Sequence, residues 1–340
     1  MDGGTLTANV KRTSVLRRVP PSRMLHYAPA FALEGDVCAF ELASDASPIL
    51  VEAVSGRAMT LARGDVFLGA PGYRESTRWV VGGIPDGGLV PGDNYWVLAD
   101  SGIVGDLAGD SPLEKTHLEQ AKYLGTVRDD DGQTLNIRQF AAAADAGAAD
   151  HRAPVSLIVG TSAEVGKTTA GTAVLRSLRQ KGHGNVIALK ATGTASLTEL
   201  DTYRDYGAAQ VFDCVDFGLP TTYPSDRRDI DRVFERALDT CLSIPADAVL
   251  IECGGDMLGA NVPVFLKLLK RRRPRPRILL AAADALGALS GKGMLKKMGL
   301  TVSLLTGPCT DTPTLRQRTE ALCGIPAVNL AEDGNESSLP

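Results

Sequence analysis

The sequence predicts an α/β protein of two domains, a small mainly β domain followed by a domain built on a parallel sheet. Three observations support this. After residue 155, continuous apolar runs alternate with amphipathic segments of helical length. The first of these runs ends in a glycine-containing loop followed by Lys-Thr-Thr. Before residue 140, the apolar runs are short and separated by Gly, Pro and Asp-Gly turns.

Length and composition fit a globular protein with no unusual partner. The chain has 340 residues, 44% of them apolar and 22% charged, and a formal net charge of −4. These values favour neither nucleic acid nor a membrane as a partner. The six cysteines form no C-x-x-C pair, so we expect buried, reduced thiols. We expect a cytoplasmic protein that acts on a small molecule and could form a homodimer.

The N-terminal half predicts a flexible arm and a β domain. Residues 1–23 are basic, show little periodicity and end in Pro20-Pro21, which predicts a flexible basic arm. Residues 24–140 form the mainly β domain, with short runs such as VCAFEL from Val37 and NYWVLAD from Asn94. Strands this short and regularly spaced are typical of a small barrel or sandwich. We see no catalytic constellation in this half.

An Ala-rich linker at 141–154 leads into the second domain, which we place at 155–330, before a polar tail at 331–340 that we expect to be disordered. Strands covered by helices on both faces form a parallel sheet, and ligands bind at the carboxyl ends of such strands. The predicted strands begin near Val155, Asn185, Gln210, Ala248, Arg277, Leu300 and Pro326.

The stretch VSLIVGTSAEVGKTT, from Val155, predicts a phosphate-binding loop. Glycines let the backbone curl so that its N–H groups face phosphate oxygens, and the following helix presents its positive end. Lys167 would reach the terminal phosphates, and the Thr168 hydroxyl would hold Mg²⁺. The predicted cofactor-binding residues are Gly160, Thr161, Ser162, Ala163, Glu164, Val165, Gly166, Lys167, Thr168 and Thr169.

Further candidates lie at the ends of other strands. Glu252 ends the apolar run AVLIEC and is the expected carboxylate ligand of Mg²⁺. Lys190 ends the second strand and could contact phosphate or a substrate carboxylate. Asp201 and Asp205, four residues apart, could complete the metal shell or could form an acidic helix surface. The predicted catalytic residues are Lys167, Lys190 and Glu252.

The loop GTSAEVGKTT has five residues between Gly160 and Gly166, one more than the usual pattern, and resembles the loop of dethiobiotin synthetase and related cobyrinate-amidating and uncharacterised P-loop proteins. ALKATG from Ala188, LIECGGD from Leu250 and DALGALSGKGML from Asp284 match in the same order. The resemblance covers about residues 155–330. It implies a P-loop NTPase-like fold, and a nucleotide base near TGPCTDTP, from Thr306. Ser162 stands where the family usually has an acid.

These observations predict an ATP- and Mg²⁺-dependent ligase or small-molecule kinase that passes the γ-phosphoryl group to a carboxylate-bearing molecule. Phosphoryl transfer needs positioning and charge neutralisation rather than a nucleophilic side chain. Two alternatives stay open. The loop could hold the phosphates of coenzyme A in an acyltransferase, or the protein could be a nucleotide-dependent regulatory switch ATPase.

Overall fold

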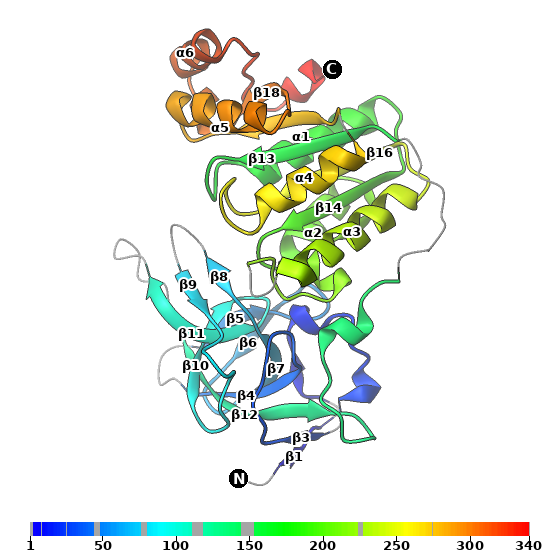
Figure 1. The fold of residues 1–340 in the computed structure, drawn as a ribbon, viewed down its shortest axis with the longest axis vertical. Helices are drawn as coiled ribbons and strands as arrows, with labels where there is room; N and C mark the ends of the chain where they lie inside the picture. The colour runs from blue at the N-terminus through cyan, green and yellow to red at the C-terminus, as the bar shows by residue number, and fades with distance from the viewer. Residues whose placement is uncertain are drawn as a thin grey trace. The chain divides into compact units, whose positions relative to one another are not determined.

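The computed structural model describes residues 3–7, 9–24, 26–43, 48–75, 80–110, 118–143, 153–223, 227–273 and 275–339. The chain folds into two compact units (Figure 1). The first comprises Met1–Ala142 with the short segments Thr194–Thr198 and Cys214–Pro224, and the second comprises Ala143–Gly193, Glu199–Asp213 and Ser225–Pro340. The units therefore divide within the predicted linker, of which residues 144–152 lie outside the described residues. The two short segments depart from the prediction, which placed them in the second domain.

A ten-stranded sheet forms the first unit, together with a separate hairpin of β5 (Ile49–Glu52) and β6 (Ala58–Leu61). Five strands of the sheet form a closed cycle of pairings, because β12 pairs with β4, β4 with β7, β7 with β11, β11 with β10, and β10 again with β12. The strands of the sheet are β1 (Gly4–Thr5), β2 (Lys11–Arg12), β3 (His26–Ala28), β4 (Cys38–Leu42), β7 (Val66–Pro71), β8 (Arg74–Glu75), β9 (Val80–Gly83), β10 (Asn94–Ala99), β11 (Ile103–Asp110) and β12 (Gln120–Arg128).

The core of the first unit is aromatic at its centre. The rings of Phe40 and Phe67 lie 5.6 Å apart, and those of Phe40 and Tyr123 lie 5.5 Å apart. All three side chains are fully buried. Buried and half-buried residues alternate along the first part of β12, which directs one face of that strand to the core. Strands β4 and β7 are instead buried at almost every position. The β-rich character expected of residues 24–140 is therefore present.

The N-terminal residues are not a flexible arm in the described part of the chain. Strand β2 pairs with β7, and Val15 and Leu16 in the 3₁₀-helix Ser14–Leu16 are fully buried. The Arg17 guanidinium lies 2.6 Å from Asp216 in the segment Cys214–Pro224 of the same unit. Apolar residues among the basic ones, which the charge pattern obscured, hold this segment in the core.

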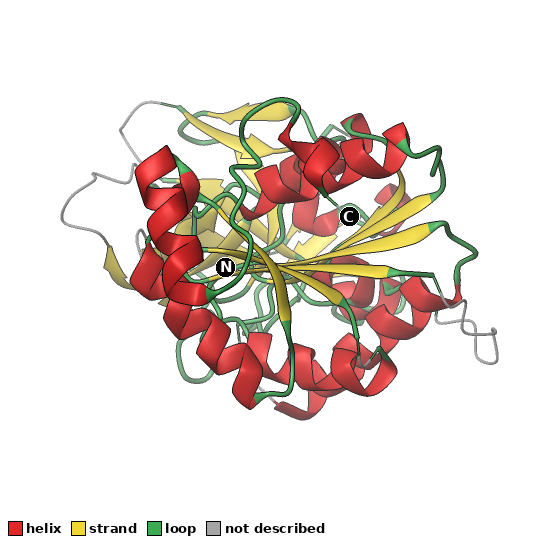
Figure 2. Cartoon of the chain, turned by 90° about the horizontal axis from the view of Figure 1, so that it is seen from above, coloured by secondary structure: helices red, strands yellow, loops and turns green. Residues whose placement is uncertain are grey.

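The second unit is a six-stranded parallel sheet in the order β15-β14-β16-β13-β17-β18. Helices lie on both faces of this sheet (Figure 2). The parallel α/β architecture of the prediction is thus confirmed. The strands are β13 (Val155–Gly160), β14 (Val186–Thr192), β15 (Ala208–Phe212), β16 (Ala248–Cys253), β17 (Arg277–Ala281) and β18 (Val302–Thr306). The helices are α1 (Lys167–Gln180), α2 (Leu197–Asp205), α3 (Arg227–Ser243), α4 (Val262–Arg272), α5 (Ala285–Lys297) and α6 (Pro313–Cys323).

Two predictions for the C-terminal end differ from the structure. The seventh strand expected at Pro326 is only a single bridge between Leu305 and Ala327. The tail expected to be disordered contains a 3₁₀-helix, Asn335–Ser338, and Leu339 is buried. Lys181 of the same unit donates a hydrogen bond to the Leu339 carbonyl at 2.8 Å. A polar composition did not reveal that this segment packs back onto its own unit.

The six cysteines are free and buried, as expected from their spacing. Among the described residues, none of the helices is both long enough and apolar enough to span a bilayer.

Candidate functional site

The phosphate loop joins the central strand β13 to helix α1. Gly166 precedes the helix with a φ of 80°, a left-handed conformation that suits glycine. A Cβ at Gly160 would lie 2.8 Å from side-chain atoms of Lys167 and Val165, so this position also requires glycine. The Lys167 ammonium curls back over the loop and donates a hydrogen bond to the Ser162 carbonyl at 2.9 Å. The loop therefore has the backbone geometry and the cation that phosphate binding needs.

Strand β16 lies next to β13 in the sheet and brings Glu252 to the start of α1. The Thr168 hydroxyl donates to a Glu252 carboxylate oxygen at 3.4 Å, and the Tyr203 hydroxyl of α2 donates to the other oxygen. Glu252 is only 2% exposed. Burial and the nearby Glu199 carboxylate raise the pKa of Glu252, although Lys190 acts in the opposite direction. The carboxylate is thus held at a defined place beside the loop.

Lys190 and Glu199 form an ion pair beside Glu252. Lys190 lies two residues before the end of β14, which pairs with β16, so that Lys190 stands opposite Glu252 in register. Burial alone would lower the pKa of Lys190, but the carboxylates of Glu199 and Glu252 outweigh burial and raise it. Burial lowers the pKa of Lys167, against the attraction of the same two carboxylates. The site therefore combines two buried lysines with two carboxylates.

Asp201 and Asp205 do not reach this site. Asp201 forms an ion pair with Arg204 on the surface of α2, and Asp205 is exposed. Tyr203 lies between them in sequence and faces Glu252, so the two aspartates fall on another face of the helix. Their spacing allowed either a role as metal ligands or a place on an acidic helix surface, and the surface describes their position.

The donor set beside the loop fits Mg²⁺. Mg²⁺ in nucleotide sites is held by one or two protein oxygens together with substrate phosphates. The Thr168 hydroxyl and the Glu252 carboxylate supply two such oxygens on adjacent elements. In the described part of the chain, three or more His, Cys, Asp or Glu side chains never gather as a metal site. A metal here would therefore need phosphate ligands as well as protein ligands.

A hollow of about 190 Å³ adjoins the phosphate loop within the second unit. Glu164, Gly166 and Thr169 line it on one side, and residues that follow β18 line it on the other. Asp311 and Asn329 contribute polar side chains to that second wall. This is the segment near Thr306 where the family resemblance placed a nucleotide base.

Sequence reasoning missed Glu199 and Tyr203 as site residues. Both lie on α2, and the pattern of that helix offered Asp201 and Asp205 with equal weight. A signal was present in the spacing, because Glu199 and Tyr203 are four residues apart and so share one helix face. Only the contacts of Glu199 with Lys190 and of Tyr203 with Glu252 identify which face turns inward.

No protein-family model matches the sequence, and a comparison with curated proteins also finds no match. Solved structures that resemble part of the fold include chloroplast FtsY from Physcomitrella patens, with 16% identity, a TM-score of 0.38, and coverage of 59% of this chain and 68% of that one. The cell division protein FtsY from Thermotoga maritima has 19% identity and a TM-score of 0.35, with coverage of 56% and 66%.

A third is the signal recognition particle 54 kDa protein from Aeropyrum pernix in complex with GDP, with 16% identity and a TM-score of 0.38, over 58% of this chain and 46% of that one. This chain therefore spans less than half of that protein. TM-scores this low describe only a partial likeness between folds. The roles proposed for residues of the loop therefore depend on the contacts within this structure. The resemblance to dethiobiotin synthetase stays a prediction.

Proposed function

We propose that the second unit binds a magnesium nucleoside triphosphate at the loop 160–169 and transfers its γ-phosphoryl group. The observation that supports this most is the convergence of three groups at the start of α1. The Lys167 ammonium lies over the loop, and the Thr168 hydroxyl meets the Glu252 carboxylate beside it. A cation for phosphate and a pair of oxygens for Mg²⁺ are the parts that phosphoryl transfer requires of a protein.

The residues have separate roles in this proposal. Lys167 would exchange its hydrogen bond to the Ser162 carbonyl for one to a phosphate oxygen, which is a stronger, charge-assisted bond. The amides of the first turn of α1, which have no partner within the helix, would face the phosphates. Thr168 and Glu252 would hold Mg²⁺, which when bound supplies positive charge beside the phosphates. The base would occupy the hollow between the loop and Asn329.

The ion pair of Lys190 supports a carboxylate-bearing acceptor. Its ammonium already binds a carboxylate, that of Glu199, whose side chain is 39% exposed while that of Lys190 is 7% exposed. An acceptor carboxylate could replace Glu199 at the same position, because it offers the same charge and geometry. A ligase or small-molecule kinase is therefore our first proposal for the reaction.

A regulatory switch ATPase is the second candidate, and a feature of the chain's course favours it. Residues Thr194–Thr198, which follow β14, and Cys214–Pro224, which follow β15, belong to the first unit, whereas their flanking residues belong to the second. If nucleotide binding displaced β14 or α2, the directly connected residues Thr194–Thr198, which belong to the first unit, would be displaced as well.

Product analysis separates these candidates. The full chain is incubated with Mg²⁺ and either ATP or GTP, with and without a panel of small carboxylates. Nucleoside diphosphate formed in equal amounts with a modified carboxylate supports the ligase or kinase. Slow hydrolysis that no carboxylate accelerates supports the switch. Consumption of an acyl-coenzyme A without any triphosphate would support the acyltransferase and overturn both.

The substitution Lys167→Ala tests the nucleotide site itself. A charge-assisted hydrogen bond to phosphate contributes about 1.5 to 3 kcal/mol, so the variant should bind triphosphate about tenfold to a hundredfold more weakly. Calorimetric titration of both proteins measures this. Lys297→Ala, which removes an exposed lysine at the end of α5, is the matched control. Equal affinity of Lys167→Ala and the parent would remove the basis of the proposal.

A further inference from the structure

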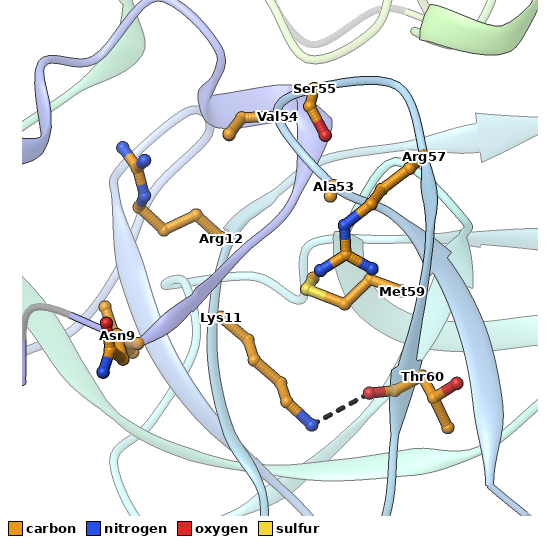
Figure 3. A pocket seen from close by; sticks show the side chains of 10 residues that line it. Asn9, Lys11, Arg12, Ala53, Val54, Ser55, Arg57, Met59 and Thr60 are labelled. Atoms are coloured by element: carbon orange, nitrogen blue, oxygen red, sulfur yellow. Dashed lines mark hydrogen bonds between the residues drawn. The ribbon is translucent and has the colours of Figure 1, made fainter.

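The hollow beside the phosphate loop is lined by acceptors rather than by cations. Its charged lining residues are Glu164, in the loop, and Asp311, after β18, and no lysine, arginine or histidine is among the described residues of its wall. A hollow of the first unit is the reverse, since Lys11, Arg12 and Arg57 line it (Figure 3). The hollow at the loop is therefore unsuited to a phosphate and suits a group that donates hydrogen bonds.

Asp311 presents a carboxylate that the protein does not use. Within the described residues its side chain makes no hydrogen bond or ion pair, although its backbone amide donates to the Pro308 carbonyl at 3.2 Å. The cap of helix α6 is the next residue, Thr312, whose hydroxyl accepts a hydrogen bond from the Leu315 amide. The Asp311 carboxylate is thus available to accept hydrogen bonds from a ligand.

Asn329 supplies a donor in the same wall. It is only 7% exposed, and its side-chain oxygen accepts a hydrogen bond from the Ala331 amide at 3.0 Å. This contact leaves the side-chain NH₂ group, with its two N–H donors, without a partner among the described residues. The wall therefore offers a charged acceptor and a neutral donor, and Leu330 and Ala331 add apolar surface.

The purine bases differ in how they match this pair of groups. Guanine presents two adjacent donors, N1–H and the 2-amino group, which fit the two oxygens of one carboxylate, and its O6 and N7 are acceptors. Adenine presents its amino group beside N1, an acceptor that a carboxylate would repel. A site built to hydrogen-bond a donor of its ligand rejects a ligand without that donor, because the polar group of the site is then left unpaired.

We infer that the nucleotide of this site is a guanosine triphosphate. The Asp311 carboxylate accepts hydrogen bonds from N1–H and the 2-amino group of the base, and the Asn329 side chain donates to O6 or N7. Asp311 is then the residue that determines the base specificity. This inference rests on the proposed nucleotide site, and it differs from the prediction made from the sequence, which named ATP.

Calorimetric titration of the full chain with Mg²⁺ and the β,γ-imido analogues of GTP and ATP, which resist hydrolysis, tests the preference. We expect the GTP analogue to bind about tenfold or more tightly than the ATP analogue, because the carboxylate makes charge-assisted hydrogen bonds only to guanine. Equal affinity, or a preference for the ATP analogue, overturns the inference and leaves the nucleotide site in place. Binding of neither analogue overturns both the inference and the proposed function.

A matched exchange of base and side chain assigns the preference to Asp311. Xanthine has a carbonyl oxygen where guanine has the 2-amino group, and the amide of an asparagine can donate to that oxygen. Asp311→Asn should therefore bind the GTP analogue about tenfold more weakly than the parent and the xanthosine triphosphate analogue about tenfold more tightly. Misfolding cannot produce the gain in affinity. An unchanged preference in Asp311→Asn contradicts the inference.

Two further variants complete the comparison. Asp231→Asn makes the same change at an exposed position of α3 and should leave all three affinities unchanged. Lys167→Ala should weaken the GTP and ATP analogues by the same factor and keep their ratio, because Lys167 is proposed to contact phosphate and not the base. The ratio of the two affinities thus tests the base, whereas their common decrease tests the phosphate loop.

Discussion

Glu252 shows how its neighbours fix the position of a single side chain. The Tyr203 hydroxyl and the Thr168 hydroxyl each donate to one of its two oxygens, which holds the carboxylate beside the loop. Burial and Glu199 raise its pKa. A carboxylate binds Mg²⁺ only when it is deprotonated, so the affinity for Mg²⁺ should fall as the pH decreases through this raised pKa. At neutral pH the two nearby lysines favour the charged form.

The substitution Glu252→Gln should abolish Mg²⁺-dependent turnover while the protein stays folded. Glutamine has the same shape and can still accept the Tyr203 hydrogen bond, but it removes the charge that binds the metal. Turnover measured over a range of Mg²⁺ concentrations, with circular dichroism to check the fold, tests this. Glu235→Gln on the exposed face of α3 is the control. If Glu252→Gln turned over nucleotide like the parent, the metal ligand would lie elsewhere.

At the scale of an element, the start of helix α2 depends on a residue far away in sequence. The backbone amides of Leu197 and Thr198 donate to the two Glu52 oxygens, each at 2.9 Å. Ser14 donates to the same carboxylate at 2.7 Å. All of these residues belong to the first unit. A carboxylate at this position satisfies amides that lack helical partners and interacts favourably with the helix dipole.

Burial by itself would raise the pKa of Glu52, but hydrogen bonds from Thr198, Ser14 and Leu197 outweigh it and lower the pKa. A lowered pKa means that the folded protein favours the ionised form. The stabilisation is therefore complete above the pKa of an unfolded glutamate, about 4.3, and is lost as the pH falls through the lower pKa of the folded state.

The variant Glu52→Gln should be less stable than the parent by about 1 to 3 kcal/mol at pH 7, because its hydrogen bonds lose their ionic partner. Urea unfolding of both proteins at pH 7 and at several lower pH values measures the difference, which should shrink once the pH falls below about 4. The same change at exposed Glu75 should have little effect. A difference that stayed constant with pH would show that the ionised carboxylate contributes nothing.

At the scale of the whole molecule, each unit has its own core, and the first core includes the N-terminal residues. Leu16 is fully buried there, beside Val15. The basic residues around them suggested a solvated arm, but charged side chains can point outward while the apolar residues between them pack inward. Membership in the core is thus decided by the complete fold of the first unit rather than by local charge.

The substitution Leu16→Ala should destabilise the first unit by about 2 to 5 kcal/mol, the usual cost of emptying a buried leucine site. Denaturant unfolding followed by tryptophan fluorescence measures this, since Trp96 lies in β10 of the first unit. Leu33→Ala in the same unit is the control, because Leu33 is 61% exposed. Equal unfolding midpoints for Leu16→Ala and the parent would support the flexible arm after all.

Much of the second unit could be predicted because its signals are local in sequence. A buried strand, a tight loop and a helix start follow one another between Val155 and Gln180, so their residue types report directly on the phosphate loop. Glu252 and Lys190 were also recognisable, because parallel strands bring their carboxyl ends to one edge of the sheet. The sequence could not show which of the residues Glu199, Asp201, Tyr203 and Asp205 belong to the site. Helical periodicity groups residues by face, but it does not tell which face packs inward.

The sequence by itself determined that a phosphate loop ends the central strand of a parallel sheet, with Glu252 and Lys190 near it. Only the tertiary structure decided that Glu199 and Tyr203 lie beside Lys190 and Glu252, and that Glu52 caps α2. The physical reason is the range of the interactions. Loops and strands follow from neighbours along the chain, whereas ion pairs, caps and hollows form between residues that only folding brings together.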